Sequence, residues 1–160
     1  MDINIAAPVI TRDEILVAAP IDTIWSIQTD VDRWPAWQPD VESAKADGPL
    51  GVGSVFHWRT AGLDITSTVE EVEPPRRIAW GGPAPGIVAV HVWTLAVEDQ
   101  GVLVRTEESW SRCATGCKTS SAQPRIKRCL SRISHGLPAV ALSSLVDEIP
   151  RAANAALAAI

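Results

Sequence analysis

The chain has 160 residues, 46% of them hydrophobic and 21% charged, a composition typical of one globular domain. Its net charge of −5 argues against nucleic acid as a partner, because nucleic-acid-binding proteins present basic surface to the phosphates. The sequence has neither a signal-peptide pattern nor a run of about 18 apolar residues, so no membrane span is predicted.

The start of the chain predicts one strand followed by two short helices. The segment TRDEILVAAP begins polar, becomes apolar and ends at Pro20, which predicts a strand near residues 11–18. After Pro20, apolar residues recur at helical spacing at positions 21, 24, 25 and 27. The next segment, DVDRWPAWQPD, offers Asp30 as an N-cap, and Pro35 limits a second helix to a turn or two.

Residues 41–111 predict six further strands. Short segments rich in β-branched side chains are separated by Gly, Pro or Asp-Gln-Gly. These segments are VESAKADG, GSVFHWRTAG, LDITSTVEEVEP, RRIAWGG, GIVAVHVWTLAVED and GVLVRTEESWS. The last two predict a hairpin with its turn at Asp99–Gly101. Short strands with tight turns and no helices between them indicate an antiparallel meander.

The end of the chain differs in composition from the rest. Residues 1–110 contain 7 Lys/Arg and 17 Asp/Glu, whereas residues 111–160 contain 7 and 2. From Thr119 onward the strand alternation disappears and apolar residues follow helical spacing. These positions are Leu137, Val140, Leu145, Val146 and Ile149, and then Ala156, Leu157 and Ile160. We therefore predict an α+β domain spanning residues 1–160. In it, a seven-stranded antiparallel curved sheet carries two short helices after strand 1 and a long C-terminal helix, whole or broken, over the sheet.

The amino-acid sequences of several segments resemble those of a known superfamily. VAAPIDTIWSIQTDVDRWPAWQPDV, GVGSVFHW, VEEVEPPRRIAW, VHVWTL and VRTEESW are similar, in this order, to the polyketide cyclase/dehydrase and lipid-transport proteins, also called START-like, SRPBCC or helix-grip proteins. The resemblance covers about residues 10–111. It implies a deep apolar cavity between the sheet and the C-terminal helix, used for lipids, hormones, polyketides or other ring compounds. Some members are aromatase/cyclases and others carriers, so the fold alone does not select a function.

Two features depart from that superfamily. Aromatase/cyclase members resemble one another in pocket Tyr and Arg side chains that polarise substrate carbonyls, but this chain has no Tyr. On the strand LDITSTVEEV, Ser67 and Thr68 are the nearest counterparts, and Arg59 on a neighbouring strand is a candidate substitute for the missing Arg. Members usually end in a long proline-free helix, whereas Pro124, Pro138 and Pro150 interrupt this one. Either the helix is broken into pieces or the end of the chain is atypical of its relatives, and a shifted reading frame would also produce such an end.

Seven tryptophans, with one Phe and no Tyr, are the most unusual feature of the composition. Trp25 and Trp34 fit core packing at the helical entry. Indoles on the strands also suit a pocket wall, because each offers flat apolar surface and one N–H donor. The predicted ligand-binding residues are Trp37, Phe56, Trp58, Trp80, Trp93 and Thr106. For the tryptophans among them, pocket lining and core packing remain open alternatives.

Strand alternation also predicts a polar group on the inward faces. His91 shares a face with Trp93, Glu108 with Trp110, and Ser67 with its neighbours two residues away. In a dry cavity, His91 would be a general base, Glu108 its orienting carboxylate and Ser67 a hydrogen-bonding hydroxyl. The alternative is a structural histidine with a solvent-facing glutamate, and a β-bulge would reverse the faces. Arg59, on the opposite parity from Trp58, is expected on the outer face.

The cysteines provide no clear site. Cys113, Cys117 and Cys129 are an odd number, which fits reduced thiols and a cytoplasmic location better than a disulfide framework. With His135 they fall within loose zinc-ligand spacing, but we expect free thiols and no metal. No phosphate-binding loop occurs, and no cofactor is expected.

Three functions follow as hypotheses. The leading one is binding of a small hydrophobic or aromatic molecule, lipid-like or polyketide-like, by a monomer or homodimer. The alternative is a polyketide cyclase or dehydratase that uses the predicted catalytic residues His91, Glu108 and Ser67 or Arg59. The third is a module that binds a partner protein and no ligand.

Overall fold

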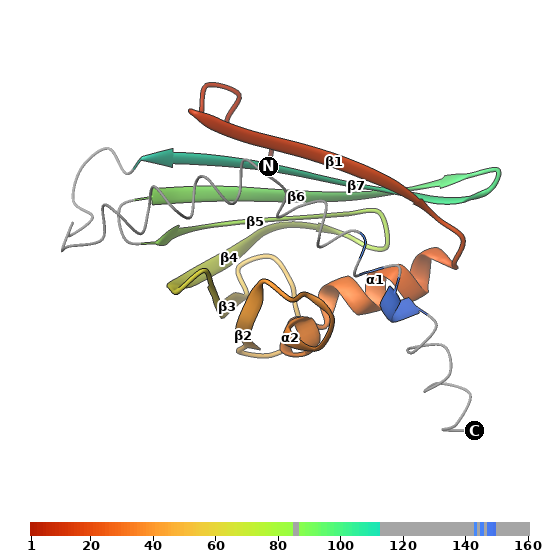
Figure 1. The fold of residues 1–160 in the computed structure, drawn as a ribbon, viewed down its shortest axis with the longest axis horizontal. Helices are drawn as coiled ribbons and strands as arrows, with labels where there is room; N and C mark the ends of the chain where they lie inside the picture. Colours follow the sequence, from red (N-terminus) through yellow and green to blue (C-terminus); the bar gives the residue numbers. More distant parts are fainter. Residues whose placement is uncertain (85–86, 113–142, 144, 146, 150–160) are drawn as a thin grey trace.

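The computed structural model describes residues 1–84, 87–112, 143, 145 and 147–149. Most of this part of the chain forms one antiparallel sheet (Figure 1). Its strands are β1 (Val9–Val17), β2 (Val41–Ala46), β3 (Val55–Thr60), β4 (Leu63–Glu73), β5 (Arg77–Ala84), β6 (Ile87–Glu98) and β7 (Gly101–Arg112). The helical segments between β1 and β2 are α1 (Ile21–Thr29), the 3-10 helix η1 (Val31–Arg33) and α2 (Trp34–Trp37).

The sheet has the order β1-β7-β6-β5-β4-β3-β2, and every neighbouring pair is antiparallel. Strands β2 to β7 are thus a continuous meander, and β1 lies beside the last strand rather than beside the second. Figure 1 shows the sheet curving, with α1 following the end of β1 and α2 beside β2. This confirms the predicted seven-stranded curved sheet and helix-grip architecture. The first strand begins at Val9, two residues earlier than its polar start suggested.

The helical entry follows from local sequence. Pro20 precedes α1 in an extended conformation, and Ile24 and Ile27 are buried on one side of the helix. The predicted side-chain cap at Asp30 is wrong: its side chain makes no capping hydrogen bond. The backbone N–H of Asp30 instead donates to the Ser26 carbonyl at 3.1 Å at the end of α1. Pro35 lies in the first turn of α2.

The turn between β6 and β7 determines the register of the longest hairpin. Glu98 pairs with Gly101, so Asp99 and Gln100 are the two turn residues. Gly101 has a φ of +149°, and a Cβ there would lie 2.4 Å from the Val17 carbonyl oxygen, so no side chain fits. Counting back from this turn places His91 directly opposite Glu108. The predicted hairpin is confirmed, and its turn aligns two of the predicted site residues.

The main core lies between the helical entry and one face of the sheet. Ile24, Val31 and Trp34 pack in the same buried cluster as Val69 and Trp80. Leu145, one of the few described residues near the end of the chain, is helical and fully buried in this cluster. Ser143 and residues 147–149 are also described as helical, whereas the rest of the predicted C-terminal helix, the three cysteines and His135 lie outside the described residues.

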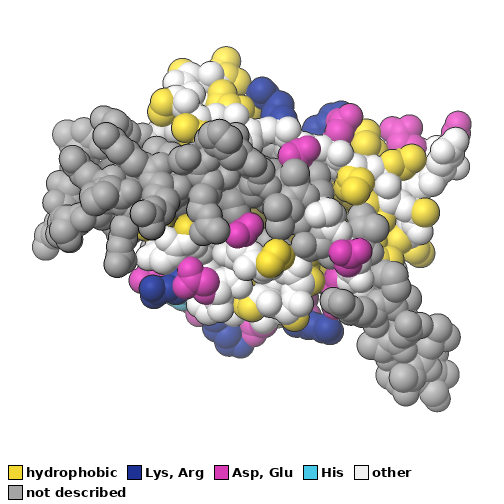
Figure 2. Space-filling model, viewed as in Figure 1, with side chains coloured by type: hydrophobic (Ala, Val, Ile, Leu, Met, Phe, Trp, Pro, Cys, Tyr) yellow, Lys and Arg dark blue, Asp and Glu magenta, His cyan; other side chains and the backbone are white. Residues whose placement is uncertain are grey.

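The outer surface of the described chain carries paired charges. Arg12 contacts Glu107 at 2.6 Å, Arg105 contacts Glu14 at 2.8 Å, and Figure 2 shows acidic side chains in several separate places on one face. Within the residues that the structure describes, no helix has both the length and the apolar character needed to cross a membrane.

Candidate functional site

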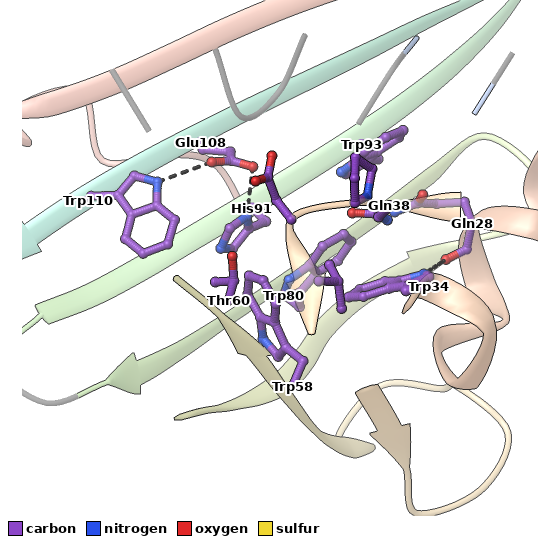
Figure 3. Close-up of a pocket in the computed structure, with 13 residues that line it drawn as sticks. Gln28, Trp34, Gln38, Trp58, Thr60, Trp80, His91, Trp93, Glu108 and Trp110 are labelled. Atoms are coloured by element: carbon purple, nitrogen blue, oxygen red, sulfur yellow. Dashed lines mark hydrogen bonds and ion pairs between the residues drawn. The ribbon is translucent and has the colours of Figure 1, made fainter. Parts of the chain in front are cut away.

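A cavity opens between the sheet and the segment that connects α2 to β2 (Figure 3). Its volume is about 50 Å³, or about 580 Å³ of empty space with the open mouth included. A single water needs roughly 10–15 Å³ of such enclosed volume, so the smaller value shows that the cavity is narrow. Among the described residues it is lined by Gln28, Trp34, Gln38, Pro39, Asp40, Val41, Trp58, Thr60, Trp80, His91, Trp93, Glu108 and Trp110. Five of these thirteen residues are tryptophans, so indole is the commonest side chain of the walls.

The centre of the site is a row of side chains that runs across three strands. Trp80 on β5 is paired with His91 on β6, and His91 is paired with Glu108 on β7. Residues directly opposite one another in antiparallel strands project to the same face. The imidazole therefore has an indole on one side and a carboxylate on the other, as Figure 3 shows.

Glu108 has two hydrogen-bond donors. His91 Nδ1 lies 3.1 Å from Glu108 Oε1, and Trp110 Nε1 donates to Oε2 at 3.1 Å. Burial of Glu108 raises its pKa, but the charge and hydrogen bond of His91 and the N–H of Trp110 outweigh burial and leave the pKa below its ordinary value. Glu108 is therefore a carboxylate at neutral pH, and it fixes His91 with the Nδ1 proton pointing toward it.

Three buried polar atoms of the cavity lining have no hydrogen-bond partner among the described residues. They are His91 Nε2, Trp80 Nε1 and Gln28 Oε1. His91, Trp80 and Gln28 are 3%, 4% and 1% exposed. A buried polar group without a partner costs about 1–3 kcal/mol, so these atoms are positions in the cavity lining where a further hydrogen bond would be favourable.

Ser67 plays a different part from the one predicted. It is buried on the inward face of β4, as alternation predicted, but its hydroxyl accepts a hydrogen bond from Trp58 Nε1 at 3.0 Å. Trp58 faces Ile65, so Ser67 is its diagonal neighbour across β3 and β4. Ser67 thus supports a wall residue and is not itself part of the cavity lining.

The structure brings together five of the predicted site residues in the cavity lining: Trp58, Trp80, Trp93, His91 and Glu108. Phe56 and Thr106 face the same side but are buried outside the lining. Trp37 lines a second pocket with Arg33 and Glu148. The orientations of Trp34 and Trp37 are therefore the reverse of the expected ones: Trp34 reaches the cavity and Trp37 does not.

Arg59 lies away from the cavity. It is on the outer face of β3, where its side chain is bound to Glu42 at 2.9 Å and to Asp64 at 3.0 Å. Because alternate residues of a strand point to opposite faces, Arg59 cannot reach the side that Trp58 occupies. Arg59 therefore lies on the outer face, as strand parity predicted, and is not among the described residues that line the cavity.

Sequence reasoning missed several lining residues. Thr60 and Trp110 were detectable, because each lies two residues after a predicted inward residue on the same strand. Trp34 was assigned to the core, and it does pack there, but it also lines the cavity and donates its N–H to the Gln28 carbonyl at 2.9 Å. Gln28, Gln38 and Asp40 come from the helical entry, where no alternation exists to reveal them.

No metal site is formed by the residues that the structure describes, which contain no cluster of three or more His, Cys, Asp or Glu side chains arranged to hold an ion.

Comparisons with known proteins agree with this architecture. Residues 8–128 match the family described as polyketide cyclase / dehydrase and lipid transport. The ZhuI aromatase/cyclase from Streptomyces sp. R1128 is similar in structure with a TM-score of 0.68 and 20% identity, over 89% of this chain and 94% of that one.

Two other solved structures are similar over nearly their whole length. A START superfamily protein from Mycobacterium smegmatis has a TM-score of 0.67 and 14% identity, over 89% of this chain and 97% of that one. A protein from Thermus thermophilus has a TM-score of 0.70 and 14% identity, over 90% and 99%. At these identities the likeness establishes the fold only. No curated protein matches the sequence.

Proposed function

The chain belongs to the polyketide cyclase/dehydrase and lipid-transport family, and we propose that it binds a small, flat, mainly hydrophobic molecule in the tryptophan-walled cavity. The observation that carries this proposal is the set of buried polar atoms, above all His91 Nε2, that have no partner among the described residues and lie between indoles. Apolar contact would supply most of the affinity, at roughly 25 cal/mol per Å² of buried surface, and the polar atoms would orient the ligand.

The narrowness of the cavity adds a condition. A molecule with one or more rings requires the side chains of the wall to move apart before it fits within a volume of about 50 Å³. Binding therefore includes a small opening of the pocket, and the indoles report it because their fluorescence depends on their surroundings.

The test is titration of the full chain with a broad panel of flat ring compounds and lipids. Tryptophan fluorescence and calorimetry measure the binding. The informative variant is His91→Phe, which keeps a ring against Trp80 but removes Nε2. His57→Phe is the matched control, because His57 is 54% exposed on the outer face. We expect about tenfold weaker binding for His91→Phe only. If no compound of the panel binds the wild-type chain, the proposal is wrong.

A second candidate function is proton transfer in a cyclisation or dehydration. It is favoured by the His91–Glu108 contact of 3.1 Å, which leaves Nε2 free to take a proton from a ligand carbon or hydroxyl. His91→Ala would then abolish turnover of a candidate poly-ketone while binding survives, and His57→Ala would have no effect. Equal turnover by His91→Ala and wild type would exclude catalysis by His91.

A further inference from the structure

The charges of the cavity lining point to a more specific class of ligand. Building on the proposed binding function, we infer that the cavity selects a protonated amine carried on a flat apolar body, and that it rejects the corresponding carboxylate. This inference rests on three features: the sign of the charge in the lining, the kind of polar atoms left without a partner, and the indole walls.

The lining is acidic. Asp40 and Glu108 supply two carboxylates, and His91 is the one group of the described lining that can become cationic. With both carboxylates ionised, the net charge of these three groups is therefore negative whether His91 is neutral or protonated. Asp13, opposite Thr106 in the β1–β7 pair, adds a half-buried carboxyl on the same face of the sheet.

Described arginines near the sheet do not offset this charge. Arg12, Arg59 and Arg105 are all bound to carboxylates on the outer face. Arg33 pairs with Glu148 at 3.4 Å in the second pocket rather than in the cavity. In the part of the chain that the structure describes, no lysine or arginine lines the cavity. A carboxylate ligand would therefore meet like charge in a partly desolvated site, where such repulsion is strong.

The unpartnered polar atoms also favour a donor. In the neutral form of His91, the Nδ1 proton points at Glu108 and the lone pair on Nε2 accepts a hydrogen bond. Gln28 Oε1 is a second acceptor without a partner among the described residues. An ammonium group carries up to three N–H donors and no acceptor, so it satisfies such atoms, whereas a carboxylate satisfies neither.

The indole walls of the cavity also suit an ammonium group. The faces of indole rings attract cations, and a Lys-like ammonium over Trp is the strongest such pair among the aromatic side chains. The apolar body of the ligand would lie along the remaining indole surface. Trp80 Nε1 is a donor without a partner among the described residues, and it would bind an oxygen on that body.

The experiment compares three probes that share one ring system: 1-naphthylmethylamine, 1-naphthalenemethanol and 1-naphthoate. Calorimetry with the full chain at pH 7 and low salt measures each Kd. We expect the amine to bind about tenfold more tightly than the alcohol, and the alcohol about tenfold more tightly than the carboxylate. An alcohol that binds as tightly as the amine, or a carboxylate that binds as tightly as either, would overturn the inference and leave the binding proposal standing. If none of the three binds but another compound of the broad panel does, the inference fails and the binding proposal stands; if no compound of the panel binds, the binding proposal itself fails.

A variant pair separates charge from shape. Asp40→Asn removes one carboxylate from the lining with almost no change of size, and Asp99→Asn does the same in the exposed hairpin turn. We expect Asp40→Asn to weaken the amine about fivefold or more and to leave the alcohol within about twofold, whereas Asp99→Asn changes neither. An equal loss for amine and alcohol in Asp40→Asn would show that Asp40 acts through shape, and would count against selection by charge.

Discussion

The imidazole of His91 lies flat against the indole of Trp80, with ring centroids 5.4 Å apart and an angle of 10° between the planes. Two further indoles meet the same imidazole edge-on: Trp110 at 5.3 Å and Trp58 at 5.7 Å. Edge-to-face and offset-stacked rings are favourable arrangements, so the imidazole is held in one orientation. Nε2 is consequently the one ring nitrogen left for a ligand, because Nδ1 is already bound to Glu108.

Replacing Trp80 by phenylalanine tests the unpartnered indole N–H. The phenyl ring keeps a flat surface for His91, and the N–H that is lost makes no hydrogen bond with a described residue. The free energy of unfolding should therefore fall by only about 1–2 kcal/mol, because some packing contact is lost. Ligands that carry an oxygen should bind several-fold more weakly, as measured by calorimetry. Trp93→Phe, in the same wall, is the control. If both variants bind equally well, the Trp80 N–H does not contribute to recognition.

Replacing Glu108 by glutamine tests the buried contact between Glu108 and His91. Because the folded state lowers the pKa of Glu108 below the ordinary 4.5, its stabilisation is complete above that pH and is lost as pH falls through the folded pKa. Wild type should therefore be more stable than Glu108→Gln at pH 7 by about 1–2 kcal/mol. The difference should shrink below pH 4.5.

Urea unfolding from pH 7 down to about 3 measures this difference, with the exposed Glu98→Gln as the control. A difference between wild type and Glu108→Gln that stays constant over the whole pH range would contradict the assignment.

Replacing Gly82 by alanine tests the close approach of β5 to β4. A Cβ on Gly82 would lie 2.0 Å from the Thr66 carbonyl oxygen, so the backbone must shift. We expect a loss of about 2–4 kcal/mol in the free energy of unfolding, measured in urea. At Gly51 the nearest atom would be Ser54 Oγ at 3.8 Å, so Gly51→Ala should stay within about 1 kcal/mol of wild type. Equal effects at the two glycines would show that the contact is not tight.

Replacing Trp34 by alanine tests whether this wall residue also supports the core. Trp34 is 3% exposed, donates to the Gln28 carbonyl and meets Phe56 edge-on at 5.4 Å. We expect Trp34→Ala to lower the free energy of unfolding by about 3–5 kcal/mol, measured by urea titration followed by circular dichroism. Trp25→Ala should cost less, because Trp25 is only partly buried at the edge of the same core. The reverse order would contradict the described packing.

Much of the candidate site could be predicted from the sequence because strand geometry is regular. Alternation along β6 and β7 placed His91 and Glu108 on inward faces, and the two-residue turn at Asp99 and Gln100 places them opposite each other. The same rule placed Arg59 outside. Residues outside the strands were not predictable in this way, because the turns around α2 have no period that relates position to direction.

The two tryptophans of RWPAW show the limit of sequence reasoning. Trp34 and Trp37 are three residues apart and both buried, so helical spacing cannot tell them apart. Only the way α2 packs on the sheet sends Trp34 into the cavity and Trp37 into the second pocket. A register shift between Val69 and Glu71 likewise interrupts the pairing of β4 with β5, which alternation alone could not reveal.

The amino-acid sequence by itself determined the strands, their antiparallel order along the meander and which residues share a face, such as His91 with Trp93 and Glu108 with Trp110, because turns and alternation are local properties of the chain. The tertiary structure decided which indoles form the cavity wall, that Ser67 supports Trp58, and that the carboxylates of Asp40 and Glu108 line one space. Those relationships depend on the curvature of the sheet and on the packing of the helical entry, which bring together residues far apart in the sequence.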